Sequence, residues 1–596
     1  MKLSTNLWLE KGFYIDIDHL GQLRIVGPGD HFYFGMINEK EKRRNYEITK
    51  IFSKKGNVFI KGYFFGPKAK FSYPVMGDVR TVRTYIYEGV GRIRSFYEIR
   101  KKFSDVLLPN KISENKKDGE YIINFERHFG EHFYGSELIL EDHIKVLQKD
   151  SCLVLSADKT AIHFTLRFYS NIFLKEDFPP KPFSLKDINF NKFNDKKDNV
   201  KRLLSISETE VKHLLRYRKT SGLDYGTIFP RDWTETAMLG YDDFSKDALH
   251  YIIRESLKYV DKKGAGWHEG GVGEFAYNRA LSHLPLIDRD MIDIEPRYIL
   301  TFGMFPEIFT EDNELLQKIQ RVASFVLAKA KRYSFIQFAE HPECRSFKAG
   351  NWRDSSAAYL HASSCIIPYD TNAVFYPAAL KVMQKFSDIL KIKGNNVQKV
   401  VTKWQDRKDL FKFKNKDDMS GYALALYSFK NEKNFQKLGV NHTDEAYDLI
   451  FGHPEEDDVL SFAERVSDPE YFYTKSGPLI VGRKDGYKSY QYHGEVIWLK
   501  QFGLCSMGLR KQLERKDFSK ETKDLIKEAI KYLFNSLIYT FDYLDLLPEL
   551  IIDKNGAPFL YNNQKNIEGH MNKIQLWSAE SARRVVFDYY DVILKA

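Results

Sequence analysis

The chain changes its periodicity once, and this change constrains its fold more than any other sequence feature. From Leu7 to about Ser170, short segments such as 13–17, 58–63 and 120–125 alternate polar and apolar residues between Gly, Asn, Asp and Lys turns. From Ser207 onward apolar residues recur at helical spacing instead. We therefore expect an α+β multidomain chain with an antiparallel β-sandwich over residues 1–175, a linker over 176–205 and a helical domain over 206–596.

The helical part contains several strongly periodic segments. They are 208–218, 246–260, 314–330, 372–390, 397–410, 495–509, 520–539 and 575–594. With shorter candidates between them, about a dozen helices fit, which is the number that an (α/α)6 toroid of two concentric rings needs. A helical solenoid can have the same number, so helix count does not separate these architectures.

Composition excludes several functional classes. The 91 basic residues are offset by 81 acidic ones without a dense basic stripe, so we expect solvated lysine-rich faces rather than a nucleic-acid partner. The N-terminus lacks the pattern of a secretory signal, and no segment has transmembrane length. A cytoplasmic protein without a membrane partner is expected. Scattered cysteines predict free thiols in a reducing compartment: Cys152, Cys344, Cys365 and Cys505.

Tryptophan placement gives the strongest functional signal. Of the seven tryptophans, five lie in short polar segments between predicted helices, each with a carboxylate within a few positions: Trp233, Trp267, Trp352, Trp498 and Trp577. Sugar rings combine apolar C–H faces with hydroxyl groups, so a glycan site needs flat aromatic faces beside charged hydrogen-bonding groups. If the helices form a toroid, the segments that join them converge at one end of the ring. The pattern predicts a carbohydrate site there.

The same residues have a structural interpretation. Single tryptophans are often core residues, and Asp232 and Asp354 are placed to open helices, where the helix dipole favours a carboxylate. For any one segment the two interpretations are equally good. Repetition of the pairing in five segments favours the carbohydrate site.

Inverting cleavage of a glycosidic bond needs one carboxylic acid to protonate the leaving oxygen and a second carboxylate to activate water. Residue type alone does not rank the candidates. They are Asp232, Glu269, Asp293, Glu295, Asp354, Asp370, Glu495, Glu549 and Glu580. The histidines show no metal-ligand spacing and the glycine-rich stretches form no phosphate loop, so we expect neither a metal nor a cofactor.

Seven short motifs share their order with a known group of enzymes. The motifs are FPRDW (229–233), GWHE (266–269), GNWRDS (350–355), YDTNAV (369–374), YHGEVIW (492–498), LPEL (547–550) and QLWSA (575–579). Together they resemble the (α/α)6 catalytic domain of six-hairpin glycosidases, which include glucoamylases, amylo-α-1,6-glucosidases, mannosylglycerate hydrolases and neutral invertases. The resemblance covers about 223–592 and is specific for the group rather than for a substrate.

This resemblance implies roles for individual residues. Asp354 falls where the group has its general acid and Glu549 where it has its base; Glu580 and Glu495 compete for the base. The residues after Glu549 and the 561–573 insertion depart from the group's pattern. Implied substrate-binding residues are Arg231, Asp232, Trp233, Trp267, His268, Glu269, Trp352, Arg353, Asn372, Tyr492, His493, Glu495, Trp498 and Trp577.

The expected function is that of an inverting, exo-acting glycoside hydrolase of α-linked glucosides or related oligosaccharides. Two alternatives stay open. A glycoside phosphorylase on the same fold would replace the base with bound phosphate, which a carboxylate at Glu549 disfavours. A non-catalytic glycan-binding protein is the third interpretation, which the presence of both Asp354 and Glu549 disfavours.

Overall fold

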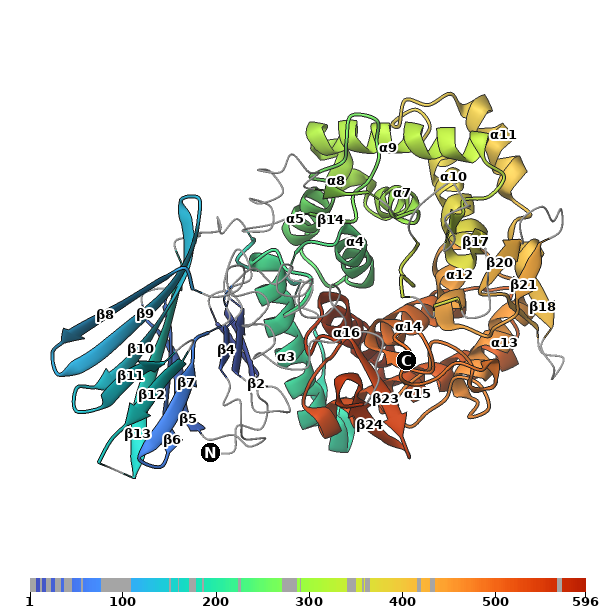
Figure 1. Cartoon of the computed structure of the whole chain (residues 1–596). Coiled ribbons are helices and arrows are strands. Elements are labelled where there is room, and N and C mark those ends of the chain that lie inside the picture. The colour runs from blue at the N-terminus through green and yellow to red at the C-terminus, as the bar shows by residue number, and fades with distance from the viewer. Residues whose placement is uncertain are drawn as a thin grey trace. The chain divides into compact units, whose positions relative to one another are not determined.

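The structure is a computed structural model, and the chain divides into two compact units (Figure 1). Unit 1 comprises residues 1–177, 213–227 and 271–286, and unit 2 comprises 178–212, 228–270 and 287–596. The structure describes residues 7–10, 13–17, 23–26, 34–36, 46–54, 57–74, 76, 109–149, 152–158, 160–170, 178–184, 187–222, 227–270, 287–289, 291–339, 350–355, 358–359, 365–414, 420–428, 435–564 and 571–595.

Unit 1 is built from antiparallel sheets. The smallest two are β1-β2-β3-β4 and β11-β12-β7, and the largest is six-stranded, in the order β5-β6-β13-β10-β9-β8. The strands are β1 (Leu7–Glu10), β2 (Phe13–Ile17), β3 (Leu23–Val26), β4 (Phe34–Met36), β5 (Tyr46–Lys54), β6 (Asn57–Phe65), β7 (Lys68–Ser72), β8 (Lys111–Lys117), β9 (Glu120–Phe129), β10 (His132–Glu141), β11 (Lys145–Lys149), β12 (Cys152–Ser156) and β13 (Ala161–Ser170).

The sheets of unit 1 share one hydrophobic core. Alternate residues of β6 and β13, such as Phe64 and Phe164, point into it, and Phe71 of β7 packs 5.9 Å from Phe125 of β9 between ring centroids. Period-2 alternation places one side of each strand in this core, as the sequence predicts. The prediction of an N-terminal antiparallel sheet domain followed by a helical part is confirmed.

Six helices of unit 2 contact one another in a closed series. They are α4 (Pro230–Leu239), α7 (Ile294–Met304), α10 (Tyr376–Lys385) with the π-helical turn η3 (Asp370–Phe375) before it, α12 (Ala446–Phe451), α14 (Leu499–Leu513) and α16 (Leu576–Tyr589). Each contacts the next, through η3 in the case of α10 and α12, and α16 contacts α4. Figure 1 shows these helices around a common centre.

Other helices pack against this series. α5 lies against α4, α9 against α7, α11 against α10, and α15 against α14 and α16. Their bounds, with those of the remaining helices, are η2 (Phe190–Lys196), α3 (Lys197–Arg216), α5 (Lys246–Ser256), α8 (Pro306–Glu311), α9 (Asn313–Arg332), α11 (Gly394–Trp404), η4 (Lys408–Phe411), η5 (Thr443–Glu445), α13 (Glu456–Ser467), η6 (Arg483–Asp485), α15 (Lys520–Leu544), η7 (Tyr561–Asn563) and η8 (Tyr590–Leu594).

Short strands connect the helices of unit 2. They are β14 (Glu269–Gly270), β15 (Ile287–Asp288), β16 (Phe338–Ala339), β17 (Cys365–Pro368), β18 (Lys412–Lys414), β19 (Ser420–Tyr422), β20 (Ala425–Ser428), β21 (Gln436–Leu438), β22 (Ile497–Trp498), β23 (Leu550–Lys554) and β24 (Ala557–Leu560). All their pairings are antiparallel.

Two details differ from the sequence prediction. Helix α3 begins at Lys197, inside the expected linker 176–205, because Val200, Leu203 and Ser207 continue the buried helical face toward the N-terminus. Helices α4 and α7 were not among the periodic segments. All ten residues of α4 are buried, so it has no polar stripe to reveal its period.

No helix among the described residues is long and apolar enough to cross a membrane. Cys152 and Cys505 are free and buried, whereas Cys365 is disulfide-bonded. The expectation of free thiols is therefore wrong for Cys365, because residue spacing carries no information about which cysteines meet in space. Cys344 lies outside the described residues. The cellular compartment stays a prediction.

Removal of the Phe164 side chain should destabilise unit 1. Its ring is buried and lies 4.7 Å from that of Phe64. We expect Phe164→Ala to cost about 3–5 kcal/mol, because the change leaves a cavity in a packed core. Amide hydrogen exchange of the six-stranded sheet measures this loss. Leu147→Ala is the control, since Leu147 is 64% exposed; equal protection in the two variants would contradict the expectation.

Candidate functional site

The candidate residues gather where the six contacting helices begin. Arg231 and Asp232 lie in the first turn of α4, Asp293 is the N-cap of α7, and Asp370 opens η3. Asp444 precedes α12, Lys500 and Gln501 begin α14, and Gln575 is the N-cap of α16. Side-chain contacts between these ends, described below, show that they meet at one place. Helix N-termini carry partial positive charge, which favours a cluster of carboxylates there.

Arg231 connects two of the candidate carboxylates. Its guanidinium lies 3.6 Å from Asp232 (Nε to Oδ1) and 3.7 Å from Asp354 (Nη2 to Oδ2). The Asp232 carboxylate also accepts a hydrogen bond of 3.0 Å from Gln575 Nε2. Burial raises the pKa of Asp232 to about 6, although Arg231 and Lys500 oppose this shift. The Asp354 side chain is 40% exposed, so solvent reaches one carboxylate of a mostly buried group.

Glu549 is buried and firmly held. Its Oε1 accepts a hydrogen bond of 2.9 Å from the Tyr492 hydroxyl, and its Oε2 accepts two from Asn572, from the backbone N at 2.9 Å and from Nδ2 at 3.1 Å. Burial raises the pKa of Glu549 to about 8, and the charge of Asp232 adds to the rise. Asp232 is therefore an electrostatic neighbour of Glu549 as well as of Arg231.

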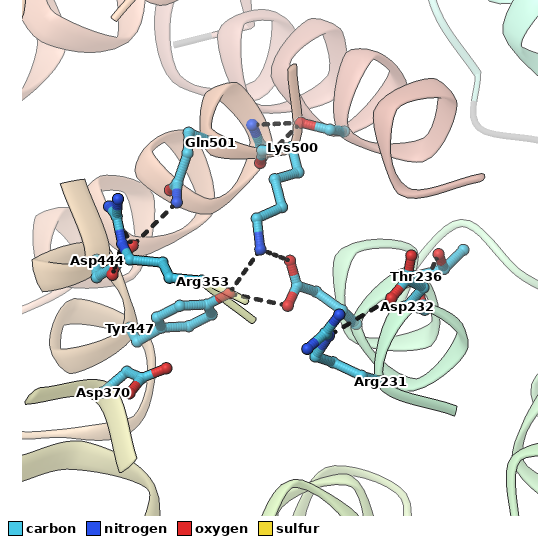
Figure 2. A network of polar contacts seen from close by, with 12 residues as sticks. Arg231, Asp232, Thr236, Arg353, Asp370, Asp444, Tyr447, Lys500 and Gln501 are labelled. Atoms are coloured by element: carbon cyan, nitrogen blue, oxygen red, sulfur yellow. Dashed lines mark hydrogen bonds and ion pairs between the residues drawn. The ribbon is translucent and has the colours of Figure 1, made fainter. Parts of the chain in front are cut away.

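A fully buried ion network lies beside these carboxylates and joins four helices. Glu235 of α4 pairs with Arg297 of α7 (Oε2 to Nη1, 2.7 Å) and with Lys500 of α14 (Oε1 to Nζ, 3.6 Å). Tyr447 of α12 donates to Glu235 Oε2 at 2.9 Å, and Arg297 Nε lies 3.4 Å from Asp293. Figure 2 shows the Lys500 ammonium between Tyr447 on one side and Arg231 and Asp232 on the other.

The opposite charges of this network stabilise one another's ionised forms. Burial opposes the charged form of Glu235, yet Lys500 and Arg297 outweigh burial and lower its pKa. Burial lowers the pKa of Lys500 to about 8, and Glu235 opposes that shift. The ammonium also lies 3.5 Å from the Trp352 ring centroid and 4.3 Å from that of Trp577. Cations over indole faces gain further stabilisation where water is excluded.

A second network fixes the segment that carries Asp354. Arg353 is buried and pairs with Asp444 through Nε–Oδ2 at 2.7 Å and Nη2–Oδ1 at 3.2 Å, and Gln501 donates to Asp444 at 3.2 Å. Asn351 donates to both carboxylate oxygens of Asp370, at 2.8 and 2.9 Å. Burial raises the pKa of Asp370 to about 7. Both anchors position the backbone of 350–355.

Three of the predicted tryptophans form one aromatic cluster. The Trp498 centroid lies 5.6 Å from Trp352 and 6.0 Å from Trp577, and the His493 ring stacks on Trp498 at 5.0 Å. Tyr492, which binds Glu549, lies 5.1 Å from Trp498. His493 Nδ1 lies 2.8 Å from Ser355 Oγ, next to Asp354. The cluster therefore contacts the segment that carries Asp354 and also includes Tyr492, which binds Glu549.

The other two tryptophans have structural surroundings. Trp233 is inside helix α4, fully buried, with its ring near Tyr251. Trp267 is buried against Tyr259, and its Nε1 donates to the Ser256 carbonyl at 2.7 Å. The expectation that all five tryptophans lie between helices is wrong for Trp233 and Trp577, which belong to α4 and α16.

The remaining predicted binding residues occupy different places. His268 packs against Phe229 and contributes to the electrostatics of Asp232, so it borders the site. Glu269 lies in β14, paired in register with Asp288. The Asn372 amide is bound to the backbone of Ile336 and Pro368, at 2.8–3.0 Å. These hydrogen bonds connect η3 to the residues before β16, so Asn372 supports the backbone in this region.

The competing carboxylates lie elsewhere. Glu580 is buried 3.7 Å from Arg583, which pairs with Asp243 at 2.7 Å. Glu495 is half-buried, and burial raises its pKa against the charges of Arg483 and Lys488. Glu295 accepts from Gly266 N at 3.1 Å and pairs with Lys329. Glu549 has other surroundings, since Tyr492 and Asn572 hold it.

Sequence reasoning missed the network residues Glu235, Arg297, Asp444, Tyr447 and Lys500, and the partners Asn572 and Gln575. Gln575 is the first residue of the QLWSA motif, so the motif was a usable signal for it. Several buried polar atoms of the site make no hydrogen bond among the described residues: Arg231 Nη1, Asp232 Oδ1, Gln575 Oε1, Trp352 Nε1, Trp577 Nε1 and His493 Nε2. Donors and acceptors thus stand together beside aromatic rings, which suits a polyhydroxylated ligand.

Comparison with known proteins gives structural similarities only. No family model and no curated protein matches the sequence. The GH63 mannosylglycerate hydrolase from Thermus thermophilus in complex with Tris aligns with a TM-score of 0.43 and 9% identity, over 64% of this chain and 99% of that chain. An uncharacterized conserved protein from the same organism aligns with a TM-score of 0.42 and 10% identity, over 64% and 99%.

A putative kojibiose phosphorylase from human microbiome aligns over 97% of this chain and 79% of that chain, with a TM-score of 0.38 and 11% identity. The structural neighbours thus include a protein named as a mannosylglycerate hydrolase and one named as a putative kojibiose phosphorylase. At these TM-scores the likeness identifies neither the substrate nor the reaction of this chain.

Proposed function

We propose that this chain is an inverting, exo-acting glycoside hydrolase of α-linked glucosides or related oligosaccharides, with Asp354 as general acid and Glu549 as general base. The observation that carries the proposal is the set of carboxylates around Arg231, which contacts Asp354 and Asp232, while Asp232 in turn acts on Glu549. Inversion uses two carboxyl groups in separate roles, and Asp354 and Glu549 are held by different partners.

The ring of helix contacts supports the proposed (α/α)6 toroid. In that architecture the six contacting helices are the inner ring, and α5, α9, α11 and α15 belong to the outer ring. Inner helices that all begin at one end would deliver the ends of six segments to a single site. The domain limits 1–175 and 206–596 stay part of this proposal.

In the proposed reaction Glu549 removes a proton from water, whose oxygen attacks the anomeric carbon. Asp354 gives its proton to the glycosidic oxygen as the bond to that carbon breaks. Tyr492 and Asn572 orient the base through their three hydrogen bonds. Arg231, Asp232 and Gln575 would bind sugar hydroxyls, and Trp352, Trp498 and Trp577 would supply the apolar surroundings of the ring.

A general acid must deliver a proton to the leaving oxygen, and Arg231 lies 3.7 Å from the Asp354 carboxylate that is proposed to do so. The raised pKa of Glu549 supports the reverse assignment in the free protein, with Glu549 as acid. The experiments below therefore separate the two roles.

Hydrolysis should depend on both carboxylates. We expect the protein to release free sugar, without added phosphate, from at least one of maltose, isomaltose, trehalose, kojibiose, sucrose, mannosylglycerate or glycogen. Asp354→Asn and Glu549→Gln should each lower kcat by about 10²–10⁴-fold, because each removes one proton transfer. Glu470→Gln, at a 65% exposed side chain, is the control. Turnover only with phosphate would instead identify a phosphorylase.

A glycosyl fluoride of the accepted sugar assigns the acid and the base. Fluoride leaves without protonation, so Asp354→Asn should hydrolyse the fluoride at a rate within about tenfold of the unaltered protein, whereas Glu549→Gln should not. Proton NMR of the first product should show the inverted anomer. The opposite pattern of activity in the two variants would exchange the roles.

The pH dependence of kcat/KM also tests whether Glu549 is the base. Burial raises the pKa of Glu549 to about 8. A base acts in its ionised form, whose fraction grows as pH rises through the pKa, so kcat/KM should increase with pH up to about 8. A value of kcat/KM that falls through this range would show that the protonated form of Glu549 is the active one.

A further inference from the structure

The outward face of the six-stranded sheet in unit 1 carries an unusual row of side chains. Because Val58, Leu166 and Leu138 point into the core, the odd-numbered residues beside them face outward. Cross-strand register aligns one outward row over all six strands: Phe52, Phe59, Arg167, Glu137, Asn124 and Ser113. A solvated sheet face is ordinarily polar, whereas this row begins with two aromatic rings.

Aromatic rings on this face pack against neighbouring groups of the sheet. Phe52 and Phe59 are parallel, with centroids 5.1 Å apart and an interplanar angle of 8°. Tyr169 covers Gly135 on the next strand, where an added Cβ would stand 2.3 Å from the ring. The Arg167 guanidinium lies 5.1 Å from the Tyr169 centroid, and the Tyr169 hydroxyl donates to Glu126 at 3.0 Å. Gly135 therefore provides the space in which this ring lies against the sheet.

Hydrogen-bonding side chains follow Phe59 along the row. Arg167 Nη1 donates to both oxygens of Glu137, at 3.1 and 3.0 Å, while its buried Nε makes no hydrogen bond among the described residues. Next in the row, Asn124 donates to Ser113 at 3.4 Å. A guanidinium, a carboxylate and a carboxamide thus follow one another beside Phe59.

A surface depression of about 400 Å³ includes Phe59, Arg167 and Glu137 of the row. Its floor contains Phe59, Ile122, Ile139, Glu137 and Arg167. It is bordered by Lys54 at the end of β5, Asn57 at the start of β6, and Lys117, Asp118 and Glu120 where β8 meets β9. The volume falls in the range of about 300–1,000 Å³ that small ligands occupy. Its charges balance, with three basic and three acidic residues: Lys54, Lys117, Arg167, Asp118, Glu120 and Glu137.

We infer that this depression and the row around it bind a neutral oligosaccharide. A sugar ring presents an apolar C–H face that can pack on Phe59, and hydroxyl groups that accept from Arg167 and donate to Glu137. The balanced charge disfavours a nucleic acid or another polyanion, which needs an excess of basic residues. This site lies wholly in unit 1 and is independent of hydrolysis at the proposed catalytic residues.

Affinity electrophoresis of the full chain through gels containing glycogen, dextran, mannan or xyloglucan tests the inference. The Glu549→Gln chain is used throughout, so that the gel polysaccharide is preserved. At least one polysaccharide should retard the protein, and adding Phe59→Ala or Arg167→Lys should raise the dissociation constant about tenfold or more. Phe65→Ala is the matched control, because Phe65 is 50% exposed on the outward face of β6 outside the depression.

Two results would overturn the inference. One is the absence of retardation by all four polysaccharides. The other is retardation that Phe59→Ala and Arg167→Lys leave unchanged, which would place glycan binding elsewhere in the chain. Arg167→Lys keeps the charge and most of the side chain, so it stays informative if Phe59→Ala does not fold. Thermal unfolding of each variant checks that the sheet is intact.

Discussion

The ion network of Glu235, Arg297 and Lys500 is the interaction on which the helical unit depends. It joins α4, α7 and α14, and the Tyr447 hydroxyl adds α12. These side chains are fully buried, where an unpaired charge costs several kcal/mol, so each charge requires its partners on neighbouring helices. A hydrophobic interface tolerates small rotations of a helix, whereas hydrogen-bonded ion pairs fix its rotation and its translation. The network thereby sets the positions of the helix ends.

Those positions determine the candidate site. Arg231 stands one turn before Glu235 on α4, Asp293 one turn before Arg297 on α7, and Lys500 lies against Trp352 and Trp577. Arg353 and Asp370 add a second set of contacts that fix the segment containing Asp354. Exclusion of water from the region raises the pKa of Asp232 and Glu549. Burial thus shifts both pKa values in the same direction, to about 6 for Asp232 and about 8 for Glu549.

Periodicity predicted the strands of unit 1 and the helices α5, α9, α11 and α15, because each of these elements has one buried and one solvated side. It also predicted α10, α14 and α16 of the closed series. It could not place α4 and α7, whose charged residues are buried together with their apolar ones. The motifs identified Arg231, Asp354, Glu549 and the cluster of Trp352, Trp498 and Trp577. They gave no sign that Arg353 is committed to Asp444 or that Lys500 lies under the tryptophans, since both contacts join residues distant in sequence. Local sequence patterns indicate which residues are buried and where the chain turns. They do not indicate which side chains pair between helices, because those pairs form only when the series of helices closes.

The stability of unit 2 in an Arg297→Met variant tests the central claim most directly. Methionine preserves the apolar part of the side chain but removes the cation that pairs with both Glu235 and Asp293. Hydrogen exchange of the α4 and α7 amides should show a loss of about 3–5 kcal/mol, the cost of breaking a buried ion pair. Arg202→Met, which removes 3.5–3.6 Å pairs with Asp542 and Asp545 from a 44% exposed side chain, should cost about 0–1 kcal/mol. Equal protection in the two variants would contradict the account.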